Sequence, residues 1–155
     1  MTTPSQHDIL NIEDALVSDE NPPRNLDSLD YERCARLHNY IVAYTWMVYH
    51  RRDTPDLNAL TKEHFRWKGY DEDRVATIRS RLDPSLNSFL DLTYDPDLPF
   101  FYWVYSLLMR LADDCFLGEE NELEDQERER FVIIYDTNPS AFSHTLGVVY
   151  DQQRH

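Results

Sequence analysis

Glycine, cysteine and positive charge are all scarce in this chain of 155 residues. Three glycines are few for a sheet protein with many tight turns, and they leave no glycine-rich loop to cradle a phosphate. The two cysteines, Cys34 and Cys115, form no paired motif, which is typical of buried thiols in a reducing compartment. No basic and then apolar leader opens the sequence, so we expect a cytoplasmic protein.

Long hydrophobic runs are missing as well. The densest apolar stretches, 40–49 and 99–112, fall short of the roughly 20 residues that a membrane span needs, so no membrane partner is expected. The chain has 29 acidic against 15 basic residues, a net charge of −14, which disfavours direct binding to a nucleic-acid backbone. With 41% hydrophobic and 13% aromatic residues, one packed core is expected.

Helical periodicity dominates the pattern of apolar residues and predicts an all-α protein. The expected fold is a single-domain bundle of about seven or eight helices around two central apolar helices, 31–52 and 99–117. Residues 1–27 form an acidic N-terminal segment with a short helix, and 28–155 form the helical core domain, which includes an acidic helix near 119–130. Cap signals place further helix starts at Thr54-Pro55, Asp71, Asp83-Pro84 and Asn138-Pro139. The apolar run 131–135 fits either a helix end or a strand.

Apolar residues of the first central helix fall at spacings of three and four, which predicts a continuous inward stripe. Its members are Cys34, Leu37, Ile41, Tyr44 and Val48. A second stripe, Val42, Trp46 and Tyr49, predicts that the C-terminal half of this helix is buried on most sides. Aromatic residues exceed what one stripe needs, and this surplus indicates a small cavity or a protein interface; a homodimer through an aromatic-rich helix is the plainest use.

The negative charge is concentrated in two segments. Residues 1–30 carry seven acids and one base, residues 113–129 carry nine acids and one base, and the rest of the chain is neutral. A charge run usually marks a solvated face, but it can also bind a basic surface on a partner protein. The residues expected to bind that partner are Asp113, Asp114, Glu119, Glu120, Glu122, Glu124, Asp125 and Glu127.

The leading hypothesis is therefore a non-enzymatic, acidic interaction protein, an inhibitor or adaptor that binds a basic protein surface. In composition the chain resembles phage inhibitors of host defence, DNA mimics and immunity partners of toxins. Carboxylates projecting at near-phosphate spacing can occupy a nucleic-acid groove on another protein, and their field accelerates association.

The alternative hypothesis is a small helical enzyme or ligand-binding domain. The motif Asp113-Asp114-Cys-Phe-Leu-Gly-Glu119, which follows the aromatic run 100–103, resembles the aspartate-rich segment of terpenoid synthases. That resemblance implies magnesium held by Asp113, Asp114 and Glu119, with a diphosphate bound to the metal. The second metal motif of that family is missing from this sequence.

The remaining candidates for chemistry are weaker. None of the six histidines shares a helix face with a second histidine or carboxylate at ligand spacing, so no zinc site is expected. The stretch 62–70 interleaves bases with aromatics and could stack single-stranded nucleic acid, but packing of the aromatics inward is the simpler interpretation.

Overall fold

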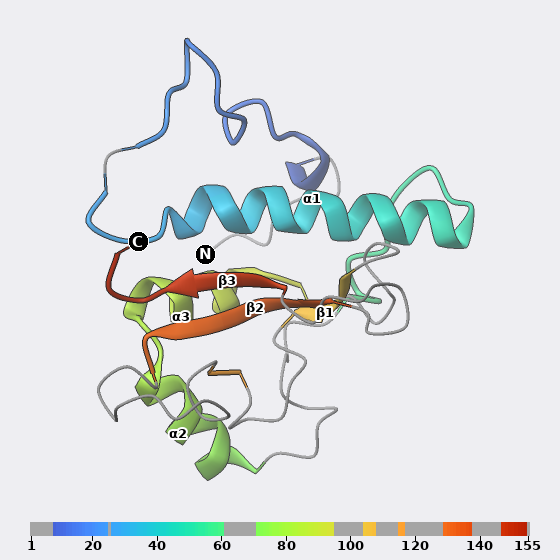
Figure 1. Ribbon diagram of the computed structural model, residues 1–155. Coiled ribbons are helices and arrows are strands. Elements are labelled where there is room, and N and C mark those ends of the chain that lie inside the picture. Colours follow the sequence, from blue (N-terminus) through green and yellow to red (C-terminus); the bar gives the residue numbers. More distant parts are fainter. Residues whose placement is uncertain are drawn as a thin grey trace.

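A computed structural model describes residues 8–24, 26–60, 71–94, 104–107, 115–116, 129–137 and 147–154. In these residues, three α-helices accompany a three-stranded antiparallel sheet and a short 3-10 helix, η1 (Asp8–Leu10). The longest helix, α1, runs alongside the sheet, and its C-terminal half extends past the strands (Figure 1). None of the helices in this part of the chain is long and apolar enough to cross a membrane.

Helix α1 (Tyr31–His50) begins and ends with clear local signals. The side chain of Asp30 accepts a hydrogen bond from the backbone N–H of Arg33, which satisfies one of the free amides of the first turn. The helix ends at Arg51, which has a left-handed backbone with φ of 51° and donates its N–H to the carbonyls of Met47 and Val48. Glycine is the usual residue in that conformation, because in other residues the Cβ atom clashes with the backbone and raises the free energy of the left-handed conformation.

The two shorter helices confirm the cap signals read from the sequence. In α2 (Glu72–Arg81), the side chain of Asp71 accepts from the N–H of Arg74. In α3 (Pro84–Leu92), the side chain of Asp83 accepts from the N–H groups of the first turn, and Pro84 occupies the position where a missing N–H costs nothing. These helices form where the sequence predicts them because capping is a local interaction.

The sheet shows that the predicted all-α bundle is wrong. Strands β1 (Val104–Leu107), β2 (Phe131–Thr137) and β3 (Val148–Asp151) are adjacent in that order and antiparallel. Val104 pairs with Thr137, and Phe131 pairs with Asp151. The apolar run 131–135, which fits helix or strand by its sequence, is therefore the centre of the sheet.

Two predicted helices fail in the same way. The described part of 99–117 contains β1 and an isolated bridge between Phe116 and Val132, and the described part of the helix expected from Asn138 contains β3. Short apolar segments satisfy both helical and strand periodicity, and pairing between distant segments decides which forms. The helix expected at Thr54-Pro55 is also absent from 54–60, and the acidic helix expected near 119–130 lies outside the described residues except for a turn at 129–130.

The main core lies between the helices and the sheet. Its buried residues are Ala35, Ile78, Leu82, Leu86, Phe89, Leu90, Cys115, Phe116, Val132, Ile134 and Tyr150. The buried side chains of α1 are Arg33, Ala35, His38, Val42 and Ala43, and of these only Val42 belongs to a predicted stripe. Tyr44, Val48 and Tyr49 are exposed by 54%, 61% and 65%, so the predicted burial of the C-terminal half on most sides is wrong.

Candidate functional site

All eight acidic residues predicted to bind a partner lie outside the described residues. These are Asp113, Asp114, Glu119, Glu120, Glu122, Glu124, Asp125 and Glu127. The three that the alternative hypothesis assigns to magnesium are among them. In the described part of the chain, no group of three His, Cys, Asp or Glu side chains is arranged to hold a metal ion. The site that can be built from geometry therefore starts from the other acidic segment.

The N-terminal segment, residues 8–24, lies on one side of α1 (Figure 1). Hydrogen bonds from two arginines of α1 attach it to the helix. The guanidinium of Arg33 donates to Oδ1 of Asn21 at 2.6 Å and to the carbonyl of Pro22 at 3.1 Å. Arg36 binds the carboxylate of Asp14 and donates to the carbonyl of Asn11 at 2.9 Å. Because these bonds reach the backbone at several points, the segment is held in one path across the helix.

Apolar contacts and an amide side chain complete this attachment. Ile9 is buried in a second small core with Val42, Ala43 and Tyr94. The side-chain amide of Asn21 donates to the carbonyls of Asp14 and Leu16, at 2.9 and 2.6 Å, and closes the loop between them. The N-terminal segment is therefore an ordered surface, on which acidic side chains occupy defined positions.

The acidic stretch 1–30 is called here the N-terminal region. Four of its acids face solvent without a basic partner in the described part of the chain. Glu13, Asp19, Glu20 and Asp27 are exposed, and none of them forms an ion pair there. Arg24 is the only base in residues 1–30. Its guanidinium already forms ion pairs with the carboxylates of Asp30, at 2.9 Å, and Glu32, at 3.4 Å. The surface of this region is consequently negative.

Three arginines elsewhere in the fold are paired with acids of the folded body. Arg79 binds Asp91 at 2.8 Å, and Arg81 binds Glu129 at 2.8 Å while its guanidinium lies over the ring of Phe116. The guanidinium of Arg130 forms a bidentate ion pair with the carboxylate of Asp151 where β2 and β3 meet. The hydrogen bonds from Arg130 lower the pKa of Asp151 to about 2. These pairs neutralise body charges and leave the excess acids of the N-terminal region uncompensated.

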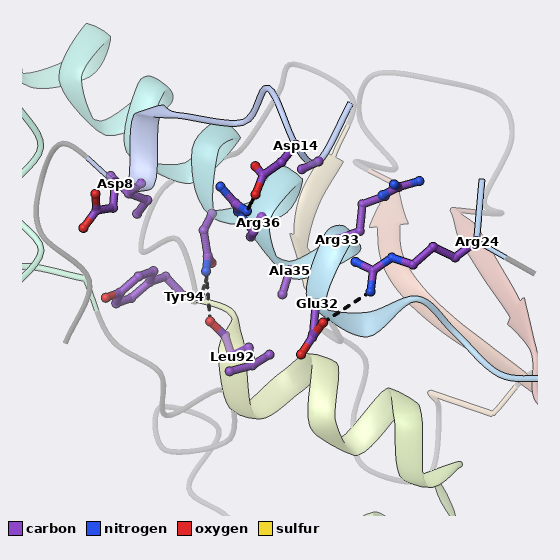
Figure 2. Close-up of a pocket in the computed structure, with 12 residues that line it drawn as sticks. Asp8, Asp14, Arg24, Glu32, Arg33, Ala35, Arg36, Leu92 and Tyr94 are labelled. Carbon is purple, nitrogen blue, oxygen red and sulfur yellow. Dashed lines mark hydrogen bonds and ion pairs between the residues drawn. The ribbon is translucent and has the colours of Figure 1, made fainter. Parts of the chain in front are cut away.

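A cavity of about 550 Å³ lies between the N-terminal segment, α1 and the end of α3 (Figure 2). Its lining residues are Asp8, Ile9, Asp14, Ala15, Arg24, Glu32, Arg33, Ala35, Arg36, Asn39, Leu92 and Tyr94. Three guanidiniums and three carboxylates share this lining, and most of their hydrogen bonds hold the N-terminal segment in place. The cavity therefore has no net preference for an anion or a cation.

A buried polar network connects α1, the end of α3 and the sheet. His38 is 2% exposed, and its Nε2 donates to the carbonyl of Tyr94 at 2.8 Å, because a carbonyl can only accept. In the neutral ring Nδ1 then accepts from the hydroxyl of Tyr135, also at 2.8 Å. The two rings stack with centroids 5.8 Å apart. No local pattern in the sequence marks this histidine, since its partners are 56 and 97 residues away.

The reactive side chains near this network are not activated. Burial raises the pKa of the Cys34 thiol, and the charge of Asp30 raises it further. Burial also raises the pKa of the Tyr135 phenol, with a smaller effect from Cys34. A thiol or phenol that keeps its proton is a poor nucleophile.

Comparison with protein-family models, with curated proteins and with solved structures found no match to this chain. Its function must therefore be argued from its own residues. The arginines that attach the N-terminal segment, Arg33 and Arg36, were not singled out in the sequence. Only their spacing of three residues near the start of a long helix marks them in the sequence. Their hydrogen-bond partners lie 11 to 25 residues away, so no local pattern predicts the attachment.

Proposed function

We propose that this chain is a non-enzymatic interaction protein that binds a basic surface of a partner protein, as an inhibitor or adaptor. One observation carries the proposal: the N-terminal region holds exposed acids on an ordered segment, while Arg79, Arg81 and Arg130 are paired with acids of the body. A fixed array of uncompensated carboxylates differs from a merely solvated face, because binding a partner need not first order it.

The sequence adds a second source of negative charge. Residues 113–129 carry nine acids and one base, and with the N-terminal region they account for the whole net charge of −14. A field of that size accelerates encounter with a basic partner and makes the association sensitive to salt. The unactivated thiol of Cys34 and phenol of Tyr135 are consistent with a protein that binds rather than catalyses.

The experiment starts by isolating the partner from a lysate of the native host with tagged protein, washed first at low and then at high salt. Binding of the purified partner is then measured against salt concentration for three charge-neutralised variants. The first replaces Glu13, Asp19 and Asp27 by their amides. The second does the same for the eight acids between Asp113 and Glu127. The control neutralises three exposed acids of the body, Asp53, Glu72 and Asp73.

The first variant loses three exposed charges. It is expected to bind the partner about tenfold more weakly at low salt and with a flatter salt dependence, since each exposed charge contributes a few tenths to 1 kcal/mol. The control changes the net charge as much as the first variant does but should bind like the native chain. Binding that is unchanged in the first two variants would show that the acids only keep the chain in solution. Retained circular dichroism in every variant confirms that folding is not the cause.

A further inference from the structure

Asn21 connects separate stretches of the N-terminal segment. Its backbone N–H donates to the carbonyl of Ser18 at 3.2 Å, and its carbonyl accepts from the N–H of Ser18 at 3.1 Å, which closes the tight loop 18–21. Its side-chain Nδ2 donates to the carbonyls of Asp14 and Leu16. Two of the exposed acids lie inside this loop, and a third directly precedes Asp14. The positions of these acids therefore depend on one amide side chain.

The guanidinium of Arg33 fixes the orientation of that amide. It donates to Oδ1 of Asn21 at 2.6 Å and to the carbonyl of Pro22 at 3.1 Å. Because Oδ1 of the amide faces a cation, Nδ2 is turned towards the carbonyls of the segment. Arg33 is 6% exposed, whereas the side chain of Arg36 is 43% exposed, so water competes less with the bonds of Arg33. Arg33 is therefore the stronger of the two attachments.

A buried arginine at position 33 is costly unless its partners are in place. Removing a guanidinium from water destabilises the fold unless hydrogen bonds replace those to the solvent, and an apolar side chain would avoid this cost. Here the N-terminal segment supplies those hydrogen bonds. The carboxylate of Asp30 lies 3.7 Å from Arg33 but also pairs with Arg24 at 2.9 Å, so it keeps a cation if Arg33 is replaced. Attachment of the segment is thus the specific task of Arg33.

We infer that the hydrogen bonds between Arg33 and Asn21 regulate the affinity of the N-terminal region for its basic partner, with Arg33 as a positioning residue for the acids. The inference rests on the proposed function. A segment released from α1 keeps all its negative charge, but its acids no longer share one arrangement. Only the attached fraction of molecules then binds with full affinity, so the apparent affinity falls in proportion to that fraction.

Arg33→Gln separates the position of the acids from their charge. The substitution removes one positive charge and takes the net charge from −14 to −15, so charge alone would strengthen binding to a basic surface. Loss of the attachment should instead weaken binding about tenfold, measured with the partner protein purified from the host lysate. The matched control is Arg52→Gln, which makes the same change of charge at an exposed arginine outside the N-terminal segment. It should bind at least as tightly as the native chain.

Asn21→Ala tests the same attachment without changing the charge or the sequence of α1. It should also weaken binding about tenfold, whereas Asn58→Ala, at an exposed asparagine, should not. Hydrogen exchange followed by mass spectrometry detects the release directly: residues 8–24 should exchange faster in Arg33→Gln and Asn21→Ala, while α3 exchanges as in the native chain. If Arg33→Gln exchanges faster throughout, it has lost its fold, and Asn21→Ala decides.

The charge-neutralised variants separate failure of this inference from failure of the proposed function. If no partner is captured, or if those variants bind like the native chain, the proposed function fails and the inference fails with it. If they bind weakly but Arg33→Gln and Asn21→Ala bind like their controls, the inference is wrong and the proposed function stands. Unchanged hydrogen exchange of residues 8–24 in both variants would also overturn the inference. Weak binding with faster exchange confined to this segment is the expected result.

Discussion

Replacing Tyr135 by Phe removes one hydroxyl from the buried network and should destabilise the fold measurably. The hydroxyl donates to Nδ1 of His38 at 2.8 Å, and that histidine is 2% exposed. Without this donor a buried ring nitrogen loses its bond, which costs about 1–3 kcal/mol. For a chain of this length each kcal/mol lowers the melting temperature by about 2–4 °C. Thermal and urea unfolding, followed by circular dichroism, measure both quantities.

The same variant has a distinct dependence on pH. Burial raises the pKa of Tyr135 above its ordinary value near 10, so its contribution to stability is complete below pH 10 and is lost as the pH rises above it. The stability of Tyr135→Phe should therefore fall less steeply above pH 10 than that of the native chain. Tyr49→Phe, at an exposed position, is the control and should match the native chain. Equal stability and equal alkaline slopes for Tyr135→Phe and the native chain would refute the proposed hydrogen bond.

Two further changes test local features. Arg51→Gly should stabilise the chain by about 0.5–1 kcal/mol, because glycine adopts the left-handed φ of 51° without a Cβ penalty. Urea unfolding measures the gain, and Arg52→Gly is the control; a gain at Arg52 alone would contradict the cap. Arg130 lowers the pKa of Asp151 to about 2, so the native chain loses stability between about pH 4 and pH 2. Asp151→Asn should flatten that acid limb, and an unaltered acid limb would refute the pairing.

Local interactions explain which parts of the fold could be predicted. The caps at Asp71 and Asp83 bind amides two or three residues away, and the proline at position 84 fixes its own φ. The long helix was also predicted, and it runs from Tyr31 to His50. In each case the residues that stabilise the structure are neighbours in the sequence, so the pattern contains the whole interaction.

The face that α1 buries was predicted wrongly for a physical reason. Tyr44 and Val48 satisfy helical spacing as well as Val42 does, so periodicity alone cannot say which of the two predicted stripes meets the core. That choice depends on where α3 and the N-terminal segment pack. Which apolar stripe remains exposed is therefore known only once the fold is known.

The candidate site divides in the same way. The excess of acids in residues 1–30 and 113–129 is a property of composition, and the sequence determines it alone. Whether an acid is neutralised depends on arginines far along the chain: Arg36 reaches Asp14 across 22 residues, and Arg81 reaches Glu129 across 48. Side-chain ion pairs of this kind form only after the backbone has folded.

The sequence by itself determined the net charge, the helix caps and the position of the longest helix, because these depend on composition or on neighbours a few residues apart. The tertiary structure alone decided that β1, β2 and β3 form a sheet, since each strand needs a neighbour distant in the sequence to complete its backbone hydrogen bonds. It also decided that His38 is buried against Tyr135, and that Glu13, Asp19, Glu20 and Asp27 lie exposed with no ion pair among the described residues.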